Sequence, residues 1–222
     1  MAGGPAKNEL ESGFAPLMVV DEITSMKTKW FLAVLAPVAM LCLTSCPETS
    51  VPRDFGSKSL TLKTADWVGT WREAGETDAF RFEIRDAEKG QLTAFTFNKE
   101  KKTEEKIEFN VRTTGFSPDD RLCFLTSFEK PDSPKGSLSL ITRPTKGVMY
   151  LWGLNHDAVE AAIKSGELKG SLQEMKEKDD KGKDKSHNHS LLNSDRGNYE
   201  KMLQPKYWEW SSPSAFVRGE AA

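Results

Sequence analysis

The sequence predicts a mainly β protein in which an antiparallel meander curls into a barrel or a half-open cup, followed by one or two short C-terminal helices. Two observations lead to this prediction. Segments of alternating apolar and polar residues recur after residue 66, as expected for strands with one buried face. Clusters of Gly, Pro, Asn and Asp separate these segments, and short reversals favour antiparallel neighbours. A sheet of about six or seven strands hides its apolar face and its edges by closing.

The first predicted strands show the clearest alternation. The segment 79–86 places Phe80, Phe82 and Ile84 on one face and charged residues on the other. The segment 106–112 repeats the pattern around Phe109. Three further strands are expected, and their apolar faces consist of Leu122, Phe124 and Phe128, of Leu138 and Leu140, and of Val148, Tyr150, Trp152 and Leu154.

After the strands the apolar period lengthens to that of a helix. Asn155 or Asp157 is a suitable N-cap, and Gly166 is a suitable stop, so the segment 155–166 is expected to form a short helix. A second short helix is expected over 193–203.

Two C-terminal segments differ in composition from the strands. The region 174–190 is dense in mixed charge and has little to bury, so we expect a disordered loop. The tail around Tyr207, Trp208 and Trp210 is too apolar to remain in solvent. We expect it to dock on the domain as a last strand or as a cover over an opening.

The N-terminal region is predicted to be an export signal. Lys27 and Lys29 precede an apolar run over 30–43, which is shorter than the roughly 20 residues of a spanning helix. Residues 26–45 are therefore expected to be a signal peptide. The polar leader 1–25 is interpreted as disordered, or as the product of a start codon assigned too early.

The end of this run resembles the lipobox of bacterial lipoproteins. Leu43, Thr44 and Ser45 supply an aliphatic residue and two small residues directly before Cys46. The resemblance implies that Cys46 is lipidated and becomes the first residue of the mature chain, so that its partner is a membrane. Pro47 stands where an inner-membrane retention signal of enteric bacteria has aspartate, which favours the outer membrane, facing the periplasm. The alternative is a chance cysteine after an ordinary signal or within a short buried helix.

The segment 46–65 is rich in Pro, Ser and Thr and is expected to be a flexible tether. The folded domain is then expected to span 66–222. At its head, Gly69-Thr70-Trp71 resembles the Gly-x-Trp motif on the first strand of lipocalins and lipocalin-like domains. The resemblance implies an eight-stranded barrel in which the glycine permits a bend, the tryptophan plugs the floor, and a basic residue near the last strand packs over that tryptophan. Arg143 is the candidate for this residue. The simpler interpretation of Trp71 is a core aromatic.

Few residues suggest chemistry. The net charge of -2 lacks the basic excess that is typical of nucleic-acid-binding proteins. His187 and His189 near Asp184 are metal-ligand types, as are the neighbouring Asp179 and Asp180. In a charged loop, however, they are more typical of solvated surface. Cys123 fits a packed strand position, and no catalytic or phosphate-binding motif occurs. We therefore expect a protein that is not an enzyme and has no cofactor and no metal.

Two functions from different classes remain open. The first is a binding module whose barrel encloses one small apolar ligand. The second is an envelope scaffold or interaction lipoprotein whose barrel is filled solid. The residues expected to line a ligand site are Trp71, Phe82, Phe109, Phe124, Tyr150 and Trp152.

Overall fold

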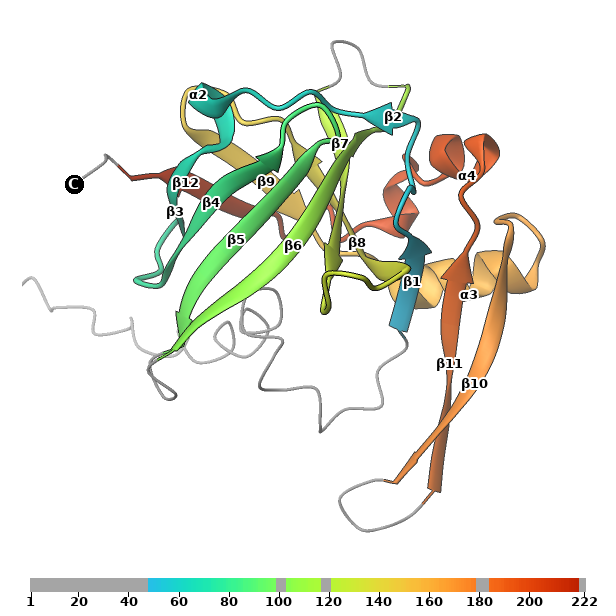
Figure 1. Cartoon of the computed structure of the whole chain (residues 1–222). Helices are drawn as coiled ribbons and strands as arrows, with labels where there is room; N and C mark the ends of the chain where they lie inside the picture. The colour runs from blue at the N-terminus through green and yellow to red at the C-terminus, as the bar shows by residue number, and fades with distance from the viewer. Residues whose placement is uncertain (1–47, 99–102, 117–120, 179–183, 220–222) are drawn as a thin grey trace, which may run out of the picture. The chain divides into compact units, whose positions relative to one another are not determined.

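A closed barrel of eight antiparallel strands dominates the part of the chain that the structure describes (Figure 1). The structure is a computed structural model, and the described residues are 48–98, 103–116, 121–178 and 184–219. The barrel strands are β3 (Gly69–Glu73), β4 (Ala79–Asp86), β5 (Gln91–Asn98), β6 (Thr103–Thr113), β7 (Leu122–Phe128), β8 (Lys135–Thr142), β9 (Val148–Trp152) and β12 (Ser214–Arg218). The predicted leader, signal peptide and lipobox lie outside the described residues.

The order of the strands around the barrel follows their order in the chain. Each strand from β3 to β8 pairs antiparallel with the next strand along the sequence. After β9 the chain leaves the barrel, and it returns as β12, which pairs with β9 on one side and with β3 on the other. This arrangement confirms the predicted antiparallel meander and barrel, and it shows that the apolar tail contributes the last strand.

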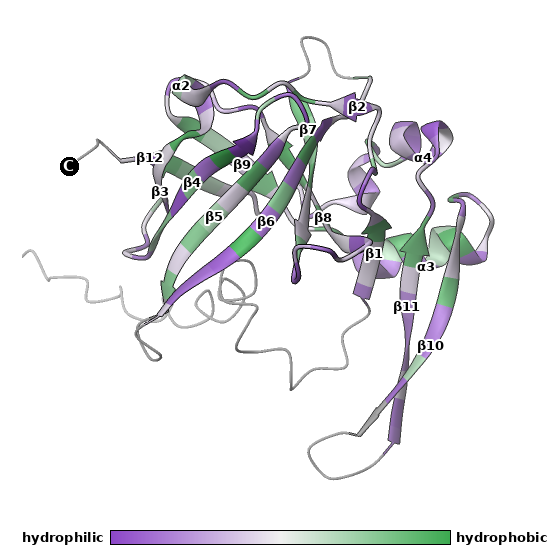
Figure 2. Cartoon of the chain, in the orientation of Figure 1, coloured by the Kyte–Doolittle hydropathy of each residue, from purple (hydrophilic) through white to green (hydrophobic). Residues whose placement is uncertain are grey.

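Register pairs identify the side chains that point into the barrel, since residues directly opposite in an antiparallel ladder point to the same face. Trp71 lies opposite Phe80, and Phe82 lies opposite Ala94, which is in turn opposite Ile107. Each of these side chains is at most 8% exposed. The alternation in β4 and β6 therefore predicted their buried faces correctly, and Figure 2 shows the alternation of hydrophobic and hydrophilic residues along these strands.

β7 and β8 bury both of their faces. Leu125 and Ile141 belong to the barrel interior, while Phe124, Leu138 and Leu140 lie on the outside of the barrel. A second apolar core covers these outer residues, and it includes residues of the chain that precedes the barrel and of the chain between β9 and β12. A strand buried on both faces loses the simple alternation of a half-exposed strand.

The excursion between β9 and β12 carries short helices. α3 (His156–Lys164) begins after Asn155, whose side chain accepts a hydrogen bond of 3.1 Å from the Ala158 N–H. α4 (Arg196–Lys201) and the 3-10 helix η2 (Pro205–Tyr207) follow later. These elements confirm the two predicted helices. None of the helices in the described ranges is both long enough and apolar enough for a membrane span.

The charged region 174–190 is not a disordered loop where the structure describes it. β10 (Gly170–Lys178) and β11 (Asp184–Leu192) form an antiparallel hairpin that pairs over its whole length. Residues 179–183 lie outside the described part. The prediction failed because it required apolar residues for a strand, whereas main-chain pairing holds this hairpin together while many of its side chains remain in solvent. Figure 2 shows mainly hydrophilic residues along β11 before its hydrophobic end.

The predicted tether is also wrong where the structure describes it. β1 (Glu48–Pro52) pairs parallel with β11 and antiparallel with β8. β2 (Lys58–Ser59) pairs with β6, and the helix α2 (Thr64–Trp67) precedes the barrel. The apolar residues of this segment are few, but they are buried: Val51, Phe55, Leu60, Leu62 and Trp67. The composition of this segment does not indicate that it is ordered, because the strands that pair with β1 lie far away in the sequence.

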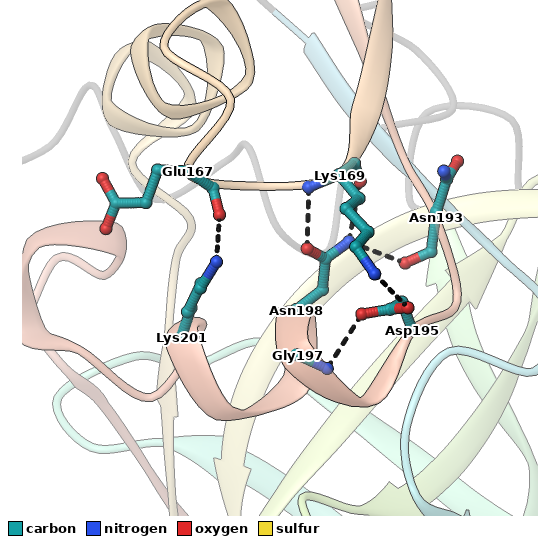
Figure 3. Close-up of polar contacts among 7 residues, drawn as sticks. All are labelled: Glu167, Lys169, Asn193, Asp195, Gly197, Asn198 and Lys201. Carbon is teal, nitrogen blue, oxygen red and sulfur yellow. Dashed lines mark hydrogen bonds and ion pairs between the residues drawn. The ribbon is translucent and has the colours of Figure 1, made fainter.

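A buried asparagine joins α4 to the start of the hairpin (Figure 3). The Asn198 side chain donates hydrogen bonds to the main-chain carbonyls of Lys169 (2.7 Å) and Asn193 (2.9 Å), and it accepts one from the Lys169 N–H (2.9 Å). Asn198 is only 1% exposed. Asp195 caps the helix through the Gly197 N–H at 2.9 Å. The amide thus adds to the main-chain hydrogen bond from the Asn193 N–H to the Lys169 carbonyl and ties α4 to the end of the hairpin.

Replacing Asn198 by alanine should lower the free energy of unfolding by about 1–3 kcal/mol, because the Lys169 N–H and the Asn193 carbonyl would lose the hydrogen bonds that the Asn198 side chain provides. The matched control is Asn193→Ala, since Asn193 joins this network only through its main chain. Its effect should stay within about 0.5 kcal/mol. Urea denaturation measures both values. Equal effects of the two substitutions would show that the network does not hold α4.

Candidate functional site

The chain between β2 and β3 covers one end of the barrel (Figure 1). At this end, the Trp71 indole N–H donates a hydrogen bond of 2.9 Å to the Trp67 carbonyl, and both tryptophans are fully buried. Gly69 has a φ of 140°, and a Cβ on it would lie 3.0 Å from the Arg218 side chain. The glycine is therefore required both by its backbone conformation and by the close approach of Arg218.

Arg218, and not Arg143, is the basic residue that packs over Trp71. Its guanidinium carbon lies 5.9 Å from the Trp71 ring centroid, and its guanidinium donates a hydrogen bond to the Ala65 carbonyl. Arg218 belongs to β12, directly opposite Trp71 in the ladder. Arg143 instead forms an ion pair with Asp66 at 3.7 Å. The sequence could not identify Arg218, because the closing strand follows a long excursion from the barrel.

The middle of the barrel is lined by aromatic rings. Phe80 makes edge contacts with Phe82 and Phe216, at centroid distances of 4.9 and 5.4 Å. Phe82 makes a similar contact with Phe109 at 5.9 Å. All four rings are at most 7% exposed. This layer offers an apolar surface to whatever the barrel holds.

Polar side chains replace the rings toward the opposite end. The register places five partly exposed polar residues on the interior face there: Glu73, Thr96, Glu105, Ser127 and Ser139. Glu73 lies opposite Phe216 in β12, so its carboxyl adjoins the aromatic layer. Burial and the nearby negative charge of Glu76 raise the pKa of Glu73 to about 7. The barrel interior therefore changes from apolar to polar along its axis.

Two polar groups at the covered end have no hydrogen-bond partner among the described residues. They are the Trp67 indole N–H and the Thr113 hydroxyl, and both residues are fully buried. A buried donor without a partner costs about 1–3 kcal/mol, so native proteins seldom leave one unsatisfied. These groups give the covered end spare hydrogen-bonding capacity.

The structure places only half of the predicted ligand residues inside the barrel. Trp71, Phe82 and Phe109 face the interior. Phe124, by contrast, packs on the outside against Phe55 at a centroid distance of 5.2 Å.

Tyr150 and Trp152 also lie on the outer face, and Tyr150 is 43% exposed. Both were predicted to point inward because they form the more aromatic face of β9. The interior face of β9 instead carries Met149 and Leu151. Glu73 was missed, although the spacing of Gly69, Trp71 and Glu73 places it on the same face of β3.

Two of the histidines, His156 and His189, contact β1. His156 Nδ1 lies 3.0 Å from the Thr49 hydroxyl, and His189 Nε2 lies 2.9 Å from the Ser50 hydroxyl. His189 Nδ1 also lies 3.2 Å from a Glu48 carboxylate oxygen. Burial lowers the pKa of His156. Among the residues that the structure describes, no three His, Cys, Asp or Glu side chains gather to hold a metal ion.

Replacing Arg218 by alanine should lower the free energy of unfolding by about 1–2 kcal/mol, since it removes the cation–π contact with Trp71 and the hydrogen bond to Ala65. Arg143→Ala is the matched control, because its ion pair is partly exposed and worth about 0.5 kcal/mol or less. Urea denaturation followed by circular dichroism compares the two variants. A larger loss from Arg143→Ala would contradict the assignment of Arg218.

Comparisons with known proteins give no further guide to function. No family model matches the chain, and neither a curated protein nor a solved structure matches it. The function is therefore inferred from the geometry of the barrel interior.

Proposed function

We propose that the protein is a lipid-anchored lipoprotein of the cell envelope whose lipocalin-like barrel holds a small apolar ligand. The observation that supports ligand binding is the graded interior of the barrel, which changes from apolar to polar along the barrel axis. One end is covered by Trp67 and Trp71, the middle is aromatic, and the other end carries polar residues that are partly exposed. Binding sites for small molecules combine a mainly apolar lining with a few polar groups that fix orientation.

The unpartnered groups at the covered end support the same proposal. A ligand with a polar atom at the covered end would give a partner to groups that the protein leaves unsatisfied there, the Trp67 indole N–H or the Thr113 hydroxyl. Satisfying them favours the bound state, because the unbound protein carries their desolvation cost.

A second candidate function is an interaction lipoprotein, and one surface feature favours it. Aromatic side chains form a row on the outside of β9 and on the segment between η2 and β12. Tyr150 lies 6.2 Å from Trp152, and Trp152 lies 4.8 Å from Trp210, measured between ring centroids. Tyr150 is exposed, whereas Trp152 and Trp210 are half-buried and pack against the second apolar core. Aromatic residues are enriched in protein interfaces. The two functions differ in which face binds, so variants on opposite faces of one strand separate them.

The neutral dye N-phenyl-1-naphthylamine should bind with increased fluorescence at micromolar concentration. Ala94→Leu adds volume inside the barrel and should weaken dye binding at least fivefold, because Ala94 is buried on the interior face and the larger side chain would occupy space that the dye needs. Thr93→Leu is the matched control, since Thr93 lies on the outer face of the same strand. Circular dichroism verifies folding. Absence of binding, or equal binding by both variants, would contradict an interior site and favour the interaction function.

The lipid anchor is proposed from the sequence over 43–46, and the fold adds a consequence. β1 begins at Glu48, so a lipid on Cys46 would hold the sheet close to the bilayer. The wild-type protein, expressed in a bacterium that processes lipoproteins, should partition into the detergent phase of Triton X-114. Cys46→Ser should move it to the aqueous phase, and the control Cys42→Ser should not. Unaltered partitioning of Cys46→Ser would overturn the anchor.

A further inference from the structure

We propose that the distal half of the β10–β11 hairpin lies among the head groups of a zwitterionic phospholipid bilayer and so fixes the orientation of the barrel on the membrane. The distal half is defined as residues 175–178 of β10 and 184–187 of β11, which pair with each other. This inference rests on the proposed lipid anchor at Cys46, and it names the part of the described chain that contacts lipid.

The register of β1 against β11 gives the direction of the hairpin. β1 and β11 are parallel, and Glu48 lies opposite His189, so the N-terminal ends of the two strands point the same way. β11 extends beyond His189 in that direction as far as Asp184, a distance of about 17 Å at roughly 3.4 Å per residue. Figure 1 shows this end of the hairpin projecting past the start of β1.

The chain between the proposed lipid and β1 is much shorter than this projection. Cys46 precedes Glu48 by two residues, so their Cα atoms are at most about 7 Å apart. If the strands stand upright on a bilayer that holds a lipid on Cys46, the distal half enters the bilayer, and if they tilt, it lies along the surface. The reverse orientation is excluded, since it would place the barrel, which adjoins β1 through β8, inside the bilayer.

The two halves of the hairpin differ in how they are packed. Near α3, the Asn188 side chain donates a hydrogen bond of 2.7 Å to the Glu160 carboxylate, and Leu192 is buried. The exposed residues of the distal half are Met175, Lys176, Asp184, Lys185 and Ser186. A two-stranded hairpin with no packed face is only marginally stable in water, so a surface that covers the distal half would stabilise it.

The depth of the contact follows from the polarity of the hairpin. β10 is the edge strand of the described sheet, so its outward main-chain groups need water or other polar partners. The hydrocarbon core of a bilayer offers none. The exposed charges have both signs, with Lys176 and Lys185 positive and Asp184 negative, and zwitterionic head groups offer phosphate and ammonium groups to both. The distal half therefore belongs in the headgroup layer, which is roughly 5–7 Å thick.

Quenching of a fluorescent label tests the inference on the lipidated protein in phosphatidylcholine vesicles. Ser186→Cys carries the label nitrobenzoxadiazole in the distal half, and Met175→Cys provides a second position on the other strand. Glu200→Cys is the matched control, because Glu200 is exposed on α4, which follows the opposite end of β11. Cys123 is fully buried, so the label reacts with the introduced thiol.

Phosphatidylcholine with a nitroxide on its head group should quench both hairpin labels at least about twofold, because quencher and labels share the headgroup layer. The label at position 200 should keep its fluorescence. Circular dichroism verifies the folding of each variant, and sedimentation with the vesicles reports the anchor separately. Sedimenting protein with equally weak quenching at all three positions would overturn this inference alone. Protein that stays in the supernatant would overturn the lipid anchor as well.

Discussion

The return of β12 between β9 and β3 is the constraint on which the rest of the structure depends. Without it, β3 and β9 would be free edges, and the aromatic layer would open to water. The same strand delivers three interior groups to β3 and β9: Ser214, Phe216 and Arg218. Phe216 completes the aromatic layer, and Arg218 covers Trp71. One pairing event thus closes the barrel and also completes its interior.

The excursion that separates β9 from β12 has its own structural role. Its helices and hairpin, together with β1, form a second apolar core on the outside of β7 and β8. This core holds the start of the described chain against the barrel, because β1 pairs with both β8 and β11. The barrel and its outer layer therefore share two strands, and a change in β8 would be felt in both cores. The graded interior that we associate with ligand binding lies on the other face of those same strands.

The sequence predicted the barrel well and its surroundings poorly, for a physical reason. β4 and β6 have one buried and one solvated face, so their alternation is visible in the sequence. Gly69 and Trp71 could be placed on the first barrel strand because the motif is local. Arg218 could not be assigned, since its contact with Trp71 joins residues at opposite ends of the domain.

The errors share a second cause. β1 is held by main-chain pairing with distant segments, and the charged hairpin is held by main-chain pairing between its own two strands. Local composition reports neither kind of pairing. Tyr150 and Trp152 were assigned to the interior because they are the larger residues of β9, but both faces of that strand carry apolar side chains. Where a strand is apolar on both faces, the sequence alone cannot decide which face is inside. Glu73 follows the simple alternation of β3. It was not predicted as an interior residue because the prediction for this strand used only the Gly-x-Trp motif.

Amide hydrogen exchange in β12 tests the closed barrel most directly. The main-chain N–H of Arg218 donates to the Gly147 carbonyl at 2.8 Å, and the strand pairs on both sides. If the closure holds as described, amides of β12 should exchange as slowly as those in the middle of β5, through global unfolding. Exchange in β12 that is orders of magnitude faster than in β5, as for a frayed terminus, would contradict the closure and the graded interior built on it.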